Sequence, residues 1–268
     1  MKTKRKLFVL VLILCSILPA NAQKHKFYTG LKAGLAIPNL TAGTKSTPLS
    51  ENYSSKLGSY GGIVGELQTS KILSIRAEIN YSSQGGKRDG MQALPLPPAL
   101  EQLWQMLPQF GITPDNYMYV DIKSKAILNY LEIPVMAKFT FSLGSRINFY
   151  MQAGPYMGIM LNAKNITSGS SSVYYKDSNG IFPIDAILSD EMKIGELPFD
   201  HTENITSDIH RFNVGGQGAV GFELNMDSGK FFIEGGGNYG FMPIQKDEAN
   251  GTNNTGAGTV TFGYLFQL

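Results

Sequence analysis

The sequence predicts an all-β protein, an eight-stranded antiparallel up-and-down transmembrane β-barrel with short periplasmic turns and long extracellular loops. Three observations lead to this prediction. The chain begins with an export signal, it repeats segments in which apolar and polar residues alternate, and its connections are alternately short and long. A period of two places side chains on opposite faces of a strand. Apart from helices, only closed barrels can cross a bilayer.

Residues 1–22 have the pattern of a signal peptide. Four basic residues are followed by the apolar segment "LFVLVLILCSIL" at 7–18 and by a cleavage sequence, "ANAQ", after Ala22. The apolar segment has 12 residues, whereas a membrane-spanning helix needs about 20. After residue 22 no apolar run reaches 18 residues. We therefore expect residues 23–268 to form the barrel domain, localised in the outer membrane.

Removal of the signal peptide changes the charge balance. The whole chain has 23 basic and 21 acidic residues, and the signal holds four of the basic ones, which leaves 19 basic and 21 acidic residues. A net charge of about −2 gives no reason to expect a nucleic-acid partner. Cys15, the single cysteine, also lies in the signal, so no disulfide is expected. The expected partners are outer-membrane lipid and an envelope or extracellular protein, without a cofactor.

Alternation is clearest in "NYLEIPVMAKF" at 129–139. Leu131 and Val135 fall on one face, whereas Glu132 and Lys138 fall on the other. An apolar outer face and a polar inner face are what a barrel wall in lipid requires. The eight predicted strands are 27–36, 62–68, 73–84, 127–141, 146–161, 211–224, 230–242 and 258–268.

The connections between these strands alternate in length. Three are short, namely "TSK", "SLGS" and "NMDSG", and the long ones are 37–57, 85–121, 162–210 and 244–256. A soluble β-sandwich, in which the charged faces would be solvated, has no reason to follow this rule and remains the alternative. Membrane barrels follow it, with short periplasmic turns and long outer loops.

The polar faces of the predicted strands bring charges of both signs toward the lumen. A barrel of eight strands is just wide enough to be filled by its own side chains. Because an unpaired buried charge is costly, we expect these residues to form a structural network of paired charges. Its predicted members are Lys32, Glu66, Arg76, Glu78, Glu132, Lys138, Glu223 and Glu234.

Two strands carry a family resemblance. "YLEIP" (130–134) and "YMQAGPYMG" (150–158), together with "GLKAGL" at 30–35 and a glycine-rich last third, resemble the PorT-like outer-membrane β-barrel proteins of Gram-negative bacteria. The resemblance covers nearly all of the chain after the signal. It implies an eight-stranded barrel, a fold for which a function is often unassigned. One member of the family serves a machine that exports proteins across the outer membrane.

One predicted loop contains an amphipathic helix, in "PLPPALEQLWQMLPQF" at 95–110. Proline can begin a helix and also end one. The apolar residues fall at i, i+3, i+4 and i+7, which gives one apolar stripe. The stripe consists of Leu100, Leu103, Trp104 and Leu107. It is predicted to pack on the base of its own loop or on the barrel rim. The functional alternative is a lid over the barrel mouth or an anchor for a partner.

Other motifs give weaker signals for chemistry. "GQGAVG" at 216–221 matches a dinucleotide-binding pattern, but it lies within a predicted strand with no helix after it, so no cofactor is expected. His201 and His210 share a loop with Ser207 and several acidic residues. That set could form a lipid-directed catalytic site or hold a metal ion, but polar loops commonly contain such residues. We predict neither a catalytic residue nor a metal site.

The long connections make up about half of the chain after residue 22, and function usually resides in loops. The sequence therefore favours a non-enzymatic barrel whose outer loops bind a partner or ligand, with a place in a secretion or transport assembly as a further hypothesis. Transport of a small solute or apolar ligand through the barrel is the first alternative. The lipid-directed enzyme based on the loop at 200–210 is the second.

Overall fold

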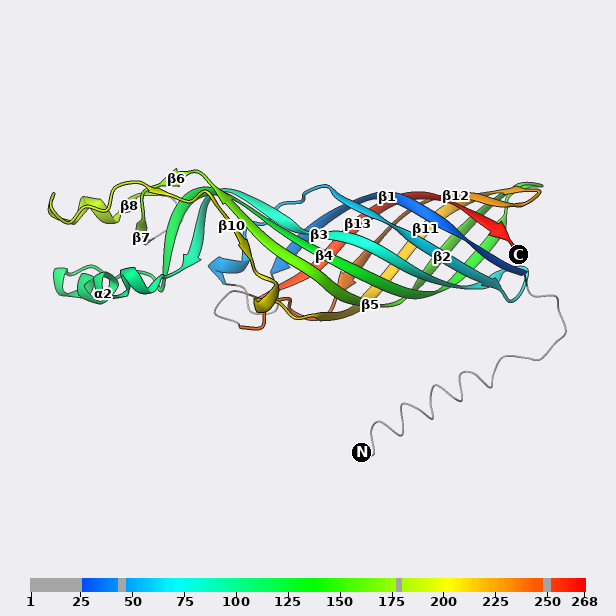
Figure 1. Cartoon of the computed structure of the whole chain (residues 1–268), viewed down its shortest axis with the longest axis horizontal. Helices are drawn as coiled ribbons and strands as arrows, with labels where there is room; N and C mark the ends of the chain where they lie inside the picture. Colours follow the sequence, from blue (N-terminus) through cyan, green and yellow to red (C-terminus); the bar gives the residue numbers. More distant parts are fainter. Residues whose placement is uncertain (1–25, 43–46, 177–179, 248–251) are drawn as a thin grey trace, which may run out of the picture.

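The computed structural model describes residues 26–42, 47–176, 180–247 and 252–268, so the predicted signal peptide lies outside the described residues. Eight strands are long and five are short (Figure 1). The long strands are β1 (Lys26–Ala42), β2 (Gly58–Gln68), β3 (Leu73–Pro95), β4 (Tyr117–Ser142), β5 (Ile147–Ser168), β11 (Phe212–Met226), β12 (Gly229–Gly240) and β13 (Asn253–Gln267). The short ones are β6 (Ser170–Ser171), β7 (Tyr174–Lys176), β8 (Phe182–Pro183), β9 (Leu197–Pro198) and β10 (His201–Asn204).

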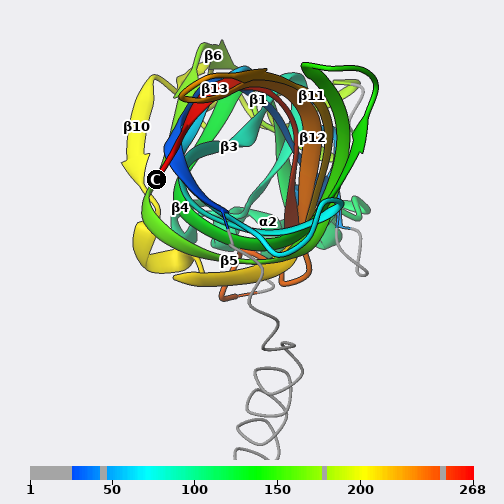
Figure 2. The same ribbon diagram turned by 90° about the vertical axis from the view of Figure 1, so that its right-hand side faces the viewer.

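Each long strand is antiparallel to two neighbours. β1 pairs with β2, β2 with β3, β3 with β4, β4 with β5, β5 with β11, β11 with β12, β12 with β13, and β13 with β1. Figure 2 shows these strands arranged around a common axis. The predicted total of eight strands is too low, because the described residues contain thirteen. The five short strands lie within the connection at 162–210 and were too short for alternation to reveal.

Three strands are much longer than predicted. β3, β4 and β5 have 23, 26 and 22 residues, so much of the predicted loop 85–121 and the start of 162–210 is strand. At about 3.4 Å per residue β4 is about 88 Å long, or about 60 Å along the axis at a tilt of about 45°. That is about twice the hydrocarbon thickness of a bilayer. We call the parts of β3 (84–95), β4 (117–129) and β5 (162–168) the extension.

The outer faces of β3 and β4 change from apolar to charged where the extension begins, and the inner face of β4 changes from polar to mostly apolar. In the barrel, the outward residues are apolar, as at Val135 and Phe139, and the inward residues are polar. In the extension, the outward positions hold charges, and Lys87 pairs with Lys125 in register. Apart from Ser124, the inward positions of β4 in the extension are apolar and buried, namely Met118, Val120, Ile122, Ala126 and Leu128. An apolar outer face suits lipid and a charged one suits water, so the exchange marks an edge of the apolar band.

Backbone irregularities accompany the exchange. The register between β4 and β5 shifts between Asn129 and Tyr130, so that Leu161 has no partner. Bulges of this kind bend a strand and re-aim its side chains. In β3, Gly85 has φ +122°, and a Cβ there would lie 2.1 Å from the main-chain oxygen of Ala126. Only glycine fits this close approach.

The long connections fold against the extension. Helix α2 (Pro98–Met106) begins after Pro97 and is followed by the 3-10 turn η2 (Leu107–Phe110), which ends at Gly111 with φ +76°. Three further 3-10 turns are η1 (Pro48–Ser50), η3 (Ile184–Ala186) and η4 (Thr206–Asp208). Figure 1 shows α2, β7 and β8 together at the far end of the extension. No helix among the described residues is long and apolar enough to cross a membrane.

Candidate functional site

The centre of the barrel holds a buried group of charged side chains from the three strands β1, β3 and β12. The Nζ atom of Lys32 lies 2.6 Å from Oε2 of Glu78 and 3.0 Å from Oε1 of Glu234. Arg76 forms ion pairs with the same two carboxylates, at 2.8 Å from Nε to Glu78 and 3.4 Å from Nη1 to Glu234. The guanidinium of Arg76 also lies 4.5 Å from the ring centroid of Phe232. Two cations thus share two carboxylates in a dry environment.

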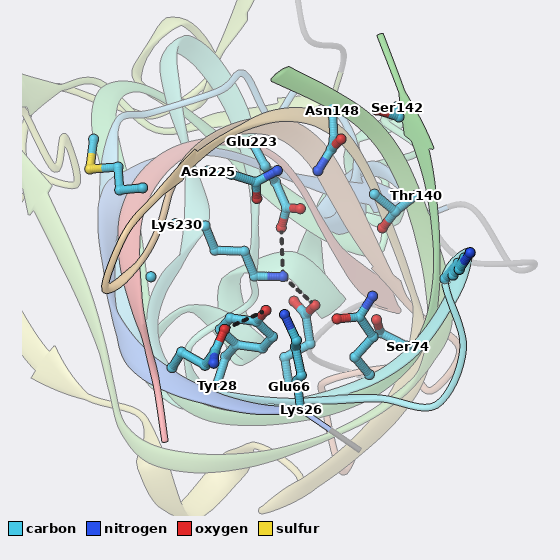
Figure 3. A pocket seen from close by; sticks show the side chains of 15 residues that line it. Lys26, Tyr28, Glu66, Ser74, Thr140, Ser142, Asn148, Glu223, Asn225 and Lys230 are labelled. Carbon is cyan, nitrogen blue, oxygen red and sulfur yellow. Dashed lines mark hydrogen bonds and ion pairs between the residues drawn. The ribbon is translucent and has the colours of Figure 1, made fainter. Parts of the chain in front are cut away.

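A second group of charges lies toward the short turns (Figure 3). Lys138 forms ion pairs with Glu66, at 2.8 Å, and with Glu223. Lys230 contacts the same two carboxylates, at 2.6 Å from Glu66 and 3.2 Å from Glu223. The sequence prediction missed Lys230, although it is four residues before Glu234 in β12 and so points to the same side of the sheet. Figure 3 shows its ammonium between the two glutamates.

Glu132 belongs to the predicted set but stands apart from both groups. It is buried in β4 and accepts hydrogen bonds from Nε2 of Gln84 at 2.6 Å and from Nδ2 of Asn238 at 2.9 Å. No cation of the described residues lies within 4 Å of its carboxylate. The structure therefore brings seven of the eight predicted charges into pairs and supports Glu132 with amides instead.

Cavities lie at both ends of this network. A polar basin of about 370 Å³ opens at the short turns, and its lining includes Lys26, Glu66, Lys71 and Lys230 (Figure 3). Between the basin and the long-loop end, the side chains of Lys32, Arg76, Glu78 and Lys138 are 0% exposed. These four side chains therefore contact other charges and not bulk water.

The second cavity, of about 460 Å³, lies between the extension and the long connections. We call it the loop-side cavity. Much of its lining is apolar, with Leu49, Leu128, Phe199, Ile209 and Ile244. Its polar lining consists of Tyr53, Arg88, Asn165, Thr167, His201, Glu203, Asp208 and Gln245. A largely apolar cavity with a few polar groups is the usual form of a small-molecule site.

Arg88 is the buried cation of the loop-side cavity, and sequence analysis placed it in a loop. The pairing of the strands locates Arg88 in the cavity. Arg88 of β3 is paired with Ser124 of β4, Ser124 with Thr167 of β5, and Thr167 with His201 of β10. Directly paired residues share one face of a sheet, so Arg88 and His201 lie on the same concave wall. The sequence signal that Arg88 points inward is the weak alternation in "GGKRDG" at 85–90, which the glycines obscure.

The predicted amphipathic stripe forms part of a core. Trp104 and Leu107 are buried with Met118 of β4 and with Val173, Tyr175 and Ile184 of the connection after β5. Leu100 and Leu103 pack against this cluster and are partly buried. The Nε1 atom of Trp104 donates a hydrogen bond to the main-chain oxygen of Asp115 at 3.0 Å. The stripe therefore packs against β4 and the connection after β5, and Trp104 is buried.

The histidine loop does not assemble a triad. His201 lies in β10 and His210 follows η4, where its main-chain nitrogen donates to the oxygen of Ile244. The hydroxyl of Ser207 has one proton and directs it to Oδ1 of Asp208 at 3.0 Å. Among the described residues, no group of three or more His, Cys, Asp or Glu side chains could hold a metal ion.

Comparisons with known proteins identify the class of the chain. The family model for the "outer membrane protein beta-barrel domain" matches residues 21–246. No curated protein matches the chain by sequence. Among solved structures, neisserial surface protein A (NspA) is 11% identical, with a TM-score of 0.40, and the alignment covers 90% of this chain and 98% of that one.

Two other solved structures are also similar. OprG from Pseudomonas aeruginosa is 9% identical, with a TM-score of 0.37 and coverage of 91% of this chain and 96% of that one. Ail, the attachment invasion locus protein of Yersinia pestis, is 10% identical, with a TM-score of 0.34 and coverage of 90% and 99%. That structure holds the heparin analogue sucrose octasulfate.

Proposed function

The chain belongs to the outer membrane protein β-barrel family, and we propose that it is a non-enzymatic binding module. In this proposal the barrel anchors the chain in the outer membrane as an eight-stranded transmembrane unit. The extension and the long connections stand outside the cell, where they bind a ligand or a partner protein. The short turns face the periplasm, in the orientation usual for such barrels.

One observation carries the proposal, namely the exchange of polarity along β4, where the outer face becomes charged and the inner face becomes mostly apolar. Strands that continue beyond the apolar band with charges outside and apolar residues inside form a water-exposed, cored structure. The buried cluster around Trp104 and Leu107 gives that structure a core of its own. It also presents exposed apolar side chains, such as Phe110, Ile181 and Met192.

The charge network supports binding over transport. An ion or solute passing through the lumen would have to displace Lys32, Arg76 and Lys138 from their carboxylates. Breaking a buried ion pair costs about 3–5 kcal/mol, and several pairs block the same passage. We propose that the lumen is closed in the resting state. The PorT-like relationship and a place in a secretion or transport assembly remain finer hypotheses within this function.

Surface labelling of intact cells tests the orientation. Because the chain after residue 22 has no cysteine, Ser189→Cys in the long connection and Asp227→Cys in a short turn are matched single probes. We expect a membrane-impermeant maleimide to label Ser189→Cys in intact cells and to label Asp227→Cys after the outer membrane is opened. Labelling in the reverse order would place the extension in the periplasm and refute the extracellular module.

Planar-bilayer recording tests the closed lumen. The purified wild-type barrel should show no steady conductance at a moderate voltage, because the paired charges occupy its centre. A stable, reproducible single-channel current from the wild type would refute the closed lumen and favour solute transport.

A further inference from the structure

We propose that the loop-side cavity binds a small organic anion with an apolar body, and that Arg88 holds its acidic group. This inference rests on the proposed binding function and names the ligand class. The acidic group would occupy the Arg88 end of the cavity. The apolar body would lie over Leu128, Ile209 and Ile244.

Arg88 is buried without a charge partner. It is 8% exposed, and among the described residues no carboxylate lies within 4 Å of its guanidinium. Its Nη1 atom donates to the main-chain oxygen of Leu49 at 3.3 Å, and its Nε atom is buried with no hydrogen-bond partner. The guanidinium lies 4.6 Å from the ring centroid of Tyr53. By contrast, Lys32, Arg76, Lys138 and Lys230 in the lumen all contact carboxylates.

A buried guanidinium with one hydrogen bond is costly unless an anion approaches it. Arginine presents a planar fork of donors that fits a carboxylate or a similar oxyanion. The Nε–H group of Arg88 is one of these donors and has no hydrogen-bond partner among the described residues. The Tyr53 ring holds the guanidinium in place without using its donors, since stacking acts on the face of the fork.

The acidic residues of the cavity lie away from Arg88. Glu203 of β10 is in register with Asn165 of β5, which pairs with Ala126 of β4 and hence with Gly86, two residues from Arg88. Three strand spacings of about 4.8 Å separate β3 from β10. Glu203 and Asp208 are exposed, so solvent screens their repulsion of an anion at Arg88. One end of the cavity is therefore cationic, and the wall beside it is apolar.

The size of the cavity limits the ligand. A volume of about 460 Å³ is within the range of about 300–1,000 Å³ of small-molecule sites. A bicyclic aromatic carboxylate matches this description, with a planar apolar body and one acidic group. We choose 2-naphthoate as the probe, because its neutral amide, 2-naphthamide, has the same shape without the charge.

Isothermal titration calorimetry on the full chain after the signal, in lipid nanodiscs, tests the inference, with empty nanodiscs as the blank. We expect 2-naphthoate to bind the wild type at least tenfold more tightly than 2-naphthamide. Arg88→Met should abolish this preference. Lys123→Met is the matched control, because Lys123 lies on the outer face of the same extension with a side chain that is 72% exposed, and it should bind as the wild type does.

A second variant keeps the test decisive if Arg88→Met does not fold. Ala126 lines the cavity, so Ala126→Phe fills it while Arg88 remains, and we expect loss of 2-naphthoate binding. Equal affinity for acid and amide, unchanged binding in either variant, or no binding to the wild type would overturn the inference. None of these results bears on the surface labelling, so failure here is distinguishable from failure of the proposed function.

Discussion

The replacement Arg76→Met tests the charge network most sharply. Arg76 is fully buried and forms ion pairs with Glu78 and Glu234. Methionine is unbranched like arginine but shorter and uncharged, so Lys32 alone would serve both carboxylates. Removal of one partner from a buried ion pair costs about 3–5 kcal/mol. With a urea slope of about 3 kcal/mol/M, the unfolding midpoint should fall by about 1–2 M.

The assay is equilibrium unfolding in urea of the barrel in phospholipid vesicles, with the folded fraction read from the mobility of unheated samples on gels. The double variant Arg76→Met/Glu78→Gln should recover part of the loss, because it removes one of the unpaired buried carboxylates. Arg146→Met, an exposed position beside a short turn, is the control and should be neutral. A midpoint for Arg76→Met within about 0.2 M of the wild type would refute the reasoning.

Three further predictions concern the polarity exchange and the buried cluster around Trp104 and Leu107. Val135→Lys, on the lipid face, should cost about 2–4 kcal/mol of unfolding free energy in vesicles, whereas Lys125→Val should change it by less than about 0.5 kcal/mol; equal effects would contradict the assigned band. Gly85→Ala forces a side chain into a left-handed conformation against the Ala126 oxygen and should speed amide exchange in the extension, and unchanged exchange would contradict this. Trp104→Ala should destabilise the buried cluster around Trp104 and Leu107 by about 3–5 kcal/mol of unfolding free energy. We expect a protease to cleave the long connections of this variant while the barrel stays intact. Connections that resist the protease as in the wild type would contradict this prediction.

Much of the barrel wall could be predicted because alternation is a local property. In β11, Phe212, Val214 and Phe222 are exposed and Glu223 is buried, as the period of two requires. The inward charges followed from the same rule. Lys230 obeys it as well, but it is the second residue of β12, and strand boundaries are the least reliable part of a sequence prediction.

The extension was missed because its polarity is the reverse of the wall. In "YMYVDIKSKAILNYLEIP" the apolar residues fall at even positions up to Leu128 and at odd positions from Leu131. A lipid-facing strand is predicted from apolar residues that stay on one face along its whole length. Because the apolar residues change face near residue 130, this rule predicts a loop before residue 127. The reversed polarity is stable only because distant loops cover the inner face of a water-exposed sheet. Contacts with distant loops cannot be read from the local pattern of a strand.

Arg88 could not be recognised from sequence for a related reason. Its neighbours Lys87 and Asp89 point outward and look like a charged loop, whereas burial of Arg88 depends on Leu49 and Tyr53 from another connection. The absence of a carboxylate within 4 Å among the described residues is likewise a three-dimensional property. Such contacts between distant segments set the chemistry of the loop-side cavity.

The central claim is that the barrel ends within β4 and a water-exposed extension begins there. Spin labels at successive outward positions of β4, from Asp121 to Phe139, test it most directly, by comparing accessibility to oxygen and to a polar nickel complex in vesicles. We expect the nickel complex to dominate from Asp121 to Lys125 and oxygen to dominate from Leu131 to Phe139. Oxygen dominance along the whole series would place the extension in lipid and contradict the account.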